Sequence, residues 1–231
     1  MRRAFVLLAL ILFALGFARV IGGYSEQQSL RPLAKSYVTQ VPAELGAPNV
    51  VTGILITYRG FDTLGEVAVL FMVAASIGLI LTKDGGKPDK PDADEIPVRK
   101  PGEIVLIGAQ VLLPLIFVFG AYVIMNGHIS AGGGFQGGAI VASGAMLMLL
   151  ARPDAAFNVA ALSIIESLAG VFYILLGIVG LVLAGGFLDP RFLPAGEFGA
   201  FVSAGAVPVI SALLGIKVGA ELSVVIDRFR S

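Results

Sequence analysis

Six long apolar runs constrain this chain of 231 residues more than any other feature. A helix that crosses about 30 Å of hydrocarbon needs roughly 20 mostly apolar residues, because it rises about 1.5 Å per residue. Such runs occupy residues 4–21, 63–81, 104–125, 135–151 and 159–184, and a sixth begins near Phe198 and continues past Gly215. The sequence therefore predicts an all-α integral membrane protein with about six transmembrane helices.

The composition agrees with a membrane protein and excludes several other classes. Hydrophobic residues make up 57% of the chain and charged residues 14%, whereas soluble domains average about 45–50% and about 25%. The sequence has no cysteine and one histidine, which excludes disulfide scaffolds, iron–sulfur ligation and thiolate zinc sites. A net charge of zero does not fit electrostatic binding of nucleic acid. With no nucleotide loop and no nucleophile–base set, we expect neither a cofactor nor an enzyme.

Basic residues lie mostly on one side of the expected membrane, and their distribution sets the direction of the chain. If consecutive runs cross in alternate directions, ten of these residues fall on the side of the termini and five on the other side. Both termini are therefore expected to be cytoplasmic. The ten are Arg2, Arg3, Lys83, Lys87, Lys90, Arg99, Lys100, Arg152, Arg228 and Arg230, and the five are Arg19, Arg31, Lys35, Arg59 and Arg191.

Two segments outside the runs organise the chain. Residues 83–103 hold 11 of the 32 charges and four prolines, which is typical of a solvated linker. The linker separates a two-helix part, residues 1–82, from a four-helix part, residues 104–231. Residues 49–58 are apolar and β-branched but too short to span, so we expect them at the outer interface or packed on a neighbour. The first run also resembles a secretory signal peptide, but we expect a true span.

The first candidate site lies at the beginning of the second run. Asp62 and Glu66 are four residues apart and share a helix face. Asp62 can cap the helix and pair with Arg59, which needs no functional role. Glu66 is followed directly by apolar residues, and a carboxylate inside a span is costly and usually faces a polar path or a partner. Glu66 is therefore a candidate for ion translocation.

The second candidate site is the turn between the third and fourth runs. Six glycines occur in 12 residues, a density that allows tight turns and close helix approach; besides Gly127 they are Gly132, Gly133, Gly134, Gly137 and Gly138. His128 in this turn is the one side chain here that titrates near neutral pH. It is either a hydrogen-bonded structural group or a proton relay.

Three further charges fall in the last two runs. Glu166 is accompanied by Ser163, Ser167, Gly170 and Gly177, a small and polar stripe that normally packs on another helix. A buried acid there needs a base, a proton or water. Lys217 and Glu221 form another four-residue pair, and their place near a helix end favours side chains that extend to the membrane surface. The full set of candidate path residues is Glu66, Asp62, His128, Glu166, Lys217 and Glu221.

Two of these segments also carry a family resemblance. Residues 59–66, RGFDTLGE with Gly60 and Gly65, resemble a motif near the end of the large A subunit of Mrp-type multisubunit cation/proton antiporters, a piece that some relatives encode separately. Residues 127–138 resemble the signature of the four-helix Mrp B subunit. That signature usually reads GHNxPGGGF; here Ile129 and Ala131 replace the asparagine and the proline, so the role of that asparagine does not carry over.

The resemblance implies a fusion of the end of an A subunit with a whole B subunit. Mrp-like modules exchange sodium for protons, either alone or inside respiratory complexes with a hydrogenase or a sulfur-reducing arm. An A piece detached from the large subunit and fused to B favours the respiratory relatives. The implied partners are other membrane subunits, the lipid bilayer, and sodium and protons as transported ions, with no nucleic acid. The implied location is the plasma membrane of a prokaryote.

Three roles remain open at the level of sequence. The chain either helps to line an ion path, or is a purely structural scaffold of a stand-alone antiporter whose acids pair with neighbouring chains. An autonomous transporter is the third possibility, although no inverted repeat or pair of broken helices is visible.

Overall fold

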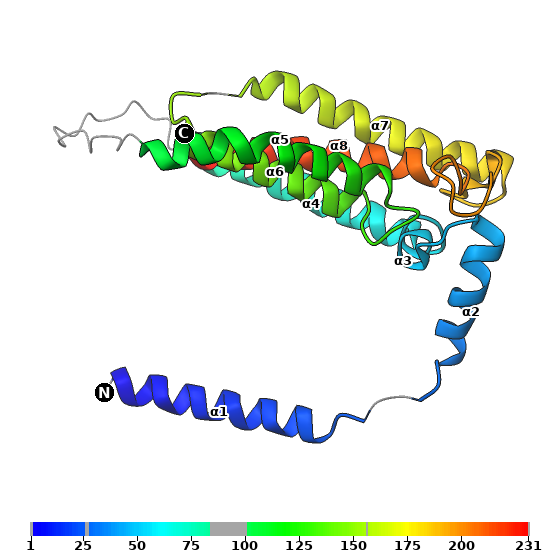
Figure 1. Cartoon of the computed structure of the whole chain (residues 1–231), viewed down its shortest axis with the longest axis horizontal. Helices are drawn as coiled ribbons and strands as arrows, with labels where there is room; N and C mark the ends of the chain where they lie inside the picture. Colours follow the sequence, from blue (N-terminus) through cyan, green and yellow to red (C-terminus); the bar gives the residue numbers. More distant parts are fainter. Residues whose placement is uncertain (1, 26–27, 84–100, 156, 231) are drawn as a thin grey trace. The chain divides into compact units, whose positions relative to one another are not determined.

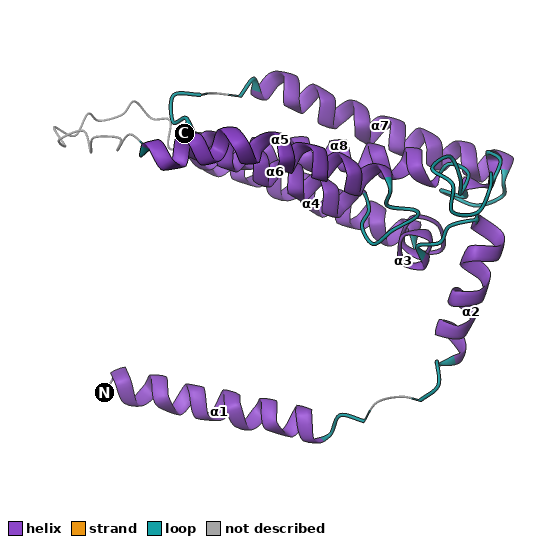
Figure 2. Ribbon diagram, in the orientation of Figure 1, coloured by secondary structure: helices purple, strands orange, loops and turns teal. Residues whose placement is uncertain are grey.

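The fold consists of helices and loops, as Figure 2 shows. The computed structural model describes residues 2–25, 28–83, 101–155 and 157–230. Within these ranges six helices are long and apolar enough to span a membrane, namely α1 (Arg2–Gly22), α4 (Gly60–Lys83), α5 (Glu103–Met125), α6 (Gly134–Ala151), α7 (Val159–Leu183) and α8 (Val207–Arg230). The predicted all-α membrane fold is confirmed. Most of the expected linker, residues 84–100, lies outside the described residues.

The chain divides into two compact units, residues 1–36 and residues 37–231. The first unit contains α1, whose described side chains are all exposed, and the beginning of α2 (Pro32–Gln40). Because α1 is apolar on every side, it suits contact with lipid or with other membrane helices.

The second unit is a bundle built around α8. This helix packs on α4, α5, α6 and α7, which lie beside one another in Figure 1. Its side chains Ile210, Leu214 and Val218 are almost completely buried, whereas α5 and α7 expose many large apolar side chains. The helix that the others cover is therefore the last one in the sequence.

Glycines bring α6 and α8 into direct backbone contact. A Cβ atom added at Gly138 would lie 2.7 Å from the Gly215 carbonyl oxygen and 3.0 Å from the Gly219 nitrogen. At Gly134 an added Cβ would collide with the Ser211 carbonyl oxygen. Real Cβ atoms do not approach a backbone this closely, so α6 and α8 pack at this distance because these residues are glycine.

The last helix begins at Val207, so the predicted beginning near Phe198 was wrong. Residues 195–206 instead form a tight loop, in which the Ala204 nitrogen donates to the Ala195 carbonyl oxygen at 2.7 Å. Within this loop Gly199, Ala204 and Gly205 have φ values of +81°, +61° and +58°, which a right-handed helix does not tolerate. Apolar residues alone therefore extended the prediction over a segment that the backbone folds as a loop.

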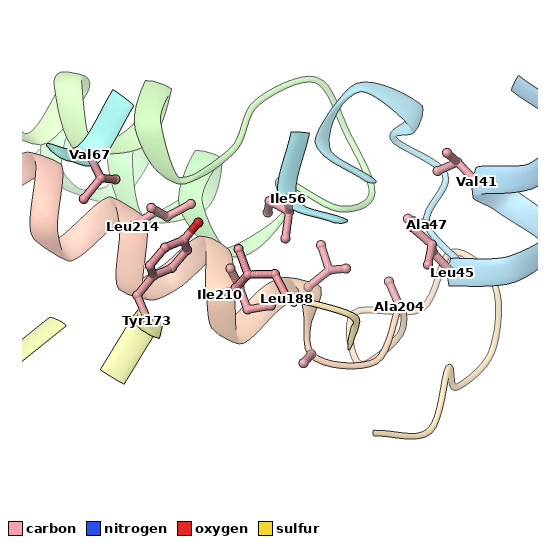
Figure 3. Packing of buried hydrophobic residues seen from close by; sticks show 12 residues of the cluster. Val41, Leu45, Ala47, Ile56, Val67, Tyr173, Leu188, Ala204, Ile210 and Leu214 are labelled. Carbon is pink, nitrogen blue, oxygen red and sulfur yellow. The ribbon is translucent and has the colours of Figure 1, made fainter. Parts of the chain in front are cut away.

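The principal core lies at the end of the bundle where this loop and the segment before α4 meet. Residues 49–58, expected at the interface or on a neighbour, form the short helix α3 (Val50–Gly53) and a π-helical turn that packs on α4 and α8. The buried cluster, drawn in Figure 3, consists of Val41, Leu45, Ala47, Ile56, Val67, Tyr173, Leu188, Ala204, Ala206, Val207, Ile210 and Leu214. Since these residues come from both the two-helix and the four-helix part, one core joins the two parts.

Replacing Gly138 with alanine is expected to destabilise the bundle by about 1–3 kcal/mol, because the added methyl group meets backbone atoms of α8 that cannot rotate away. Thermal unfolding of the chain in mild detergent, followed by circular dichroism, measures the loss. Gly108→Ala in α5 is the matched control, because no atom lies within 4 Å of its added Cβ. Equal unfolding midpoints for the two variants would contradict the close α6–α8 contact.

Candidate functional site

A cluster of three charged side chains lies between α7 and α8. The Lys217 ammonium on α8 donates to Glu221 Oε2 at 2.8 Å, one helical turn further along, and to Glu166 Oε1 on α7 at 3.3 Å. The exposed fractions of Lys217, Glu166 and Glu221 are 6%, 8% and 0%. All three lie within spanning helices. The sequence singled out each residue, but it did not place Glu166 with the other two.

The expectation that Lys217 and Glu221 extend to the membrane surface was therefore wrong. Both project into the bundle because the small stripe of α7, with Gly170 3.6 Å from Lys217 Cε, leaves room for the lysine stem against α8. The ammonium also lies 5.9 Å from the centre of the Phe71 ring on α4. Two carboxylates and one ammonium leave the cluster one positive charge short of neutrality, so it can take up a proton or a cation.

Glu66 lies apart from this cluster, on the exposed side of α4. It borders a cavity of about 310 Å³ between α3, α4 and α6, together with Thr52, Thr63 and Gln136. The same cavity is lined by the glycines that begin α6, including Gly132, Gly133 and Gly134. The two sequence motifs thus meet at one polar cavity, although they are separated by more than sixty residues in the chain.

Asp62 is oriented toward solvent or lipid headgroups and away from this cavity. Its carboxylate accepts a hydrogen bond from Arg59 Nε at 2.5 Å, and both side chains are about half exposed, at 51% and 56%. Asp62 also lies in the first turn of α4, where the helix dipole favours an acid. This geometry gives Asp62 a local structural role, and Gly60 beside it packs on the Leu188 side chain.

His128 is completely buried beneath the loop that precedes α8. Its Nε2 lies 3.1 Å from the Phe201 carbonyl oxygen; a carbonyl can only accept, so Nε2 carries the hydrogen. Burial lowers the pKa of His128 below its usual 6.5, and hydrogen bonding to the backbone of Ala200, Phe201 and Met125 opposes the shift only in part. The ring is neutral at neutral pH and connects two loops.

Asn49 holds the glycine-rich turn in place, and the sequence did not mark it as a candidate. Its Nδ2 donates at 2.7 Å to the carbonyl oxygens of Gly127 and Ser130, and its Oδ1 accepts from the backbone nitrogens of Val51 and Thr52 at the beginning of α3. The Asn49 nitrogen donates to the His128 carbonyl oxygen at 3.0 Å. An asparagine directly before a short helix is a known capping signal, but its contacts 78 residues away are not readable from sequence.

The acids of the loop end already have partners. The Tyr58 hydroxyl donates to Glu44 Oε2 at 2.6 Å, and burial together with this carboxylate raises the pKa of Tyr58 to about 12. Asp189 accepts from Arg191 Nε at 2.9 and 3.0 Å. Burial alone raises the Asp189 pKa, but the Arg191 hydrogen bonds outweigh it and lower that pKa overall. These pairs stabilise the loops.

Comparison with known proteins decides the family. Residues 104–224 match the model of a domain related to the MnhB subunit of a Na⁺/H⁺ antiporter. The chain belongs to this MnhB-related family. Its residues 1–90 match the model of the E subunit of MBH, which agrees with the two-motif resemblance. This MnhB-related chain is thus an antiporter-like, multi-pass membrane protein in which the two pieces are fused.

Two relatives share parts of this organisation. An uncharacterized protein of Methanocaldococcus jannaschii is 31% identical over 76% of this chain and 74% of its own length. A probable K⁺/H⁺ antiporter A/B subunit of Rhizobium meliloti is 31% identical over 51% of this chain, which corresponds to 14% of that protein.

Two solved structures share the fold. A chain of the membrane-bound sulfane sulfur reductase, an archaeal respiratory membrane complex, matches with a TM-score of 0.80 and 32% identity, over 99% of this chain and 97% of that chain. A chain of the Mrp complex from Dietzia matches in fold with a TM-score of 0.76 and 24% identity, over 99% of this chain and 26% of that one.

Changing Asn49 to aspartate is expected to loosen the glycine-rich turn. Aspartate keeps the oxygen that caps α3, but it replaces a donor with an acceptor facing the Gly127 and Ser130 carbonyl oxygens. Hydrogen exchange of residues 127–134 should accelerate, and stability should fall by about 1–3 kcal/mol for the lost buried donor. Asn126→Asp is the matched control, because that amide is exposed and donates only to its own helix. Unchanged exchange in the Asn49 variant would contradict the clamp.

The His128 environment predicts a loss of stability on acidification. The unfolded chain binds a proton near pH 6.5, and the folded chain binds it only at lower pH, so the unfolded state takes up more protons below about pH 6.5. Stability is complete above that pH and decreases as the pH falls through it, by at most about 1.4 kcal/mol per pH unit. Unfolding midpoints between pH 8 and 5.5 measure the slope. Since the chain has one histidine, His128→Gln should flatten this dependence, and an unchanged slope would contradict it.

Proposed function

We propose that the chain is an accessory membrane component of an Mrp-like sodium/proton antiporter module within a larger respiratory complex, and that its buried charges form part of the ion path. The observation that carries the proposal is the Lys217 ammonium held between Glu166 and Glu221 inside the bundle. Charges are costly to bury, and within membranes they commonly mark ion and proton routes. Glu66, which lines the cavity beside the glycine-rich turn, is proposed as the second acid of the path.

The cluster offers a simple way to couple a proton to a movement of charge. A proton that reaches Glu166 neutralises that carboxylate and weakens its attraction for the Lys217 ammonium. Lys217 is already shared between two acids at 2.8 and 3.3 Å, so it then moves fully to Glu221 without leaving a charge unpaired. When Glu166 loses the proton, the shared position is restored, and the carboxylate is again available to a cation.

The respiratory setting is supported by the extent of one likeness. The chain covers 97% of its counterpart in the sulfane sulfur reductase complex, whereas it covers 26% of the Mrp chain from Dietzia. A protein of matching length and domain order fits a complex with separate small subunits. We place both termini in the cytoplasm of a prokaryotic cell, with residues 83–103 as the linker between residues 1–82 and 104–231. Sodium is proposed as the cation, although the relative from Rhizobium is named for K⁺/H⁺ exchange.

A purely structural scaffold is the second candidate function. It is favoured by the exposed α1, whose apolar surface suits binding to other subunits, and by the internal pairing of each cluster acid with Lys217. The two functions differ in what happens when a charge is removed but the fold is kept.

Replacing Glu166 with glutamine is expected to slow sodium-driven proton transport at least about tenfold in the assembled complex, because the amide cannot take up or release the proton. Glu66→Gln should act in the same direction. The measurement is the pH change inside liposomes that carry the purified complex, with subunit content checked by gel. Glu197→Gln is the matched control, since that acid is exposed in a loop outside the spans. Intact transport with both Glu66→Gln and Glu166→Gln would leave only the scaffold function.

A further inference from the structure

Tyr173 on α7 is the largest completely buried side chain, and its hydroxyl is unpaired. Its exposed fraction is 1%, and the hydroxyl oxygen has no hydrogen-bond partner among the residues that the structure describes. Buried hydroxyls are almost always hydrogen bonded, either to protein or to water. Figure 3 shows the ring crossing from α7 toward α8, with its hydroxyl end directed to Val67 and Leu214, which offer no polar atom.

The ring borders a cavity that also reaches the charged cluster. This cavity, of about 280 Å³ between α4, α7 and α8, is lined by Tyr173, Glu166, Lys217 and Ser167 together with apolar residues. A water molecule needs space for about one probe sphere and two to four polar partners, and the cavity offers both. Tyr173 is seven residues after Glu166, which is two helical turns, so the two side chains project from the same face of α7.

The opposite side of Tyr173 faces Glu66. The Glu66 carboxylate on α4 is close enough to interact electrostatically with the Tyr173 hydroxyl. Val67, the next residue, lines the Tyr173 cavity, while Leu214 lines the Glu66 cavity, and both pack on the ring in one cluster. Tyr173 therefore stands between two polar cavities that apolar side chains otherwise separate.

We propose that the Tyr173 hydroxyl binds water on both sides and is the proton link between Glu66 and the Glu166–Lys217 pair. The inference rests on the proposed function, because it names the connection between the two acids of the same path. A water on the Glu66 side gives a proton to the hydroxyl oxygen as the hydroxyl releases its own proton to a water beside Glu166. One O–H bond forms as another breaks, so the phenol is unchanged after each transfer.

The experiment uses the complete complex that carries the full-length chain, and the variant Tyr173→Phe. Phenylalanine keeps the ring in the apolar cluster and removes only the hydroxyl, so assembly is retained. Proton transport in liposomes should slow roughly tenfold, which corresponds to the loss of one hydrogen-bonded step. The ratio of the rates in H₂O and D₂O should change as well, which a loss of packing alone does not cause. Tyr122→Phe on α5, an exposed tyrosine in another span, is the matched control and should leave both quantities unchanged.

Infrared spectroscopy tests the bound water independently of transport. In the difference spectrum between the unmodified complex and Tyr173→Phe, the tyrosine C–O band should have the frequency of a hydrogen-bonded hydroxyl and should shift in H₂¹⁸O. A band of a free hydroxyl, which a lipid chain in the cavity would produce, overturns the proposal. Unchanged transport in Tyr173→Phe, with transport lost in Glu166→Gln, also overturns it and leaves the proposed function standing. Unchanged transport in Glu66→Gln and Glu166→Gln as well overturns both.

Discussion

One ammonium group shared by two carboxylates constrains the position of every helix in the second unit. Lys217, Glu166 and Glu221 are nearly inaccessible, so none of them is solvated by bulk water. Removing one partner from such a group costs about 3–5 kcal/mol, because the remaining charge stays buried without compensation. The register of α7 against α8 is therefore fixed by an ionic contact within apolar surroundings. Since α8 also contacts α4, α5 and α6, the position of the cluster is transmitted to the whole bundle.

The two family pieces are held together at both ends of the bundle. At the loop end, Asn49 and Thr52 bind carbonyl oxygens of the glycine-rich turn. At the opposite end, Arg228 on α8 donates to the Ala74 carbonyl oxygen of α4 at 2.9 Å, and its guanidinium packs directly on Gly78. These contacts do not depend on the peptide linker. The interface between the pieces therefore explains how the same arrangement suits relatives that encode the two pieces separately and a chain in which they are fused.

Sequence was a good guide to the helices and a weaker guide to the site. Apolar runs and the flanking Gly and Pro residues located five of the six spans to within three residues, because length and hydropathy alone determine a span. The sixth beginning was missed because positive φ values at Ala204 and Gly205 have no signature in hydropathy. Glu66, Glu166 and Lys217 were recognised as charges inside spans. Which of them meet depends on the packing of α7 on α8, and neither periodicity nor charge in a single sequence encodes that contact.

Tyr173 illustrates the same limit from the opposite side. A tyrosine in an apolar run is most simply a packing residue, and its position two turns after Glu166 was readable but carried no meaning before the cavity was known. Packing is unequal along the bundle: the loop end contains the continuous core, while the charged cluster further along α8 borders a cavity. Dense packing resists displacement, whereas a cavity lets side chains and water rearrange. Lys217 can therefore change partners while the Asn49 clamp and the beginning of α8 stay fixed, which is the combination that a proton-coupled membrane protein needs.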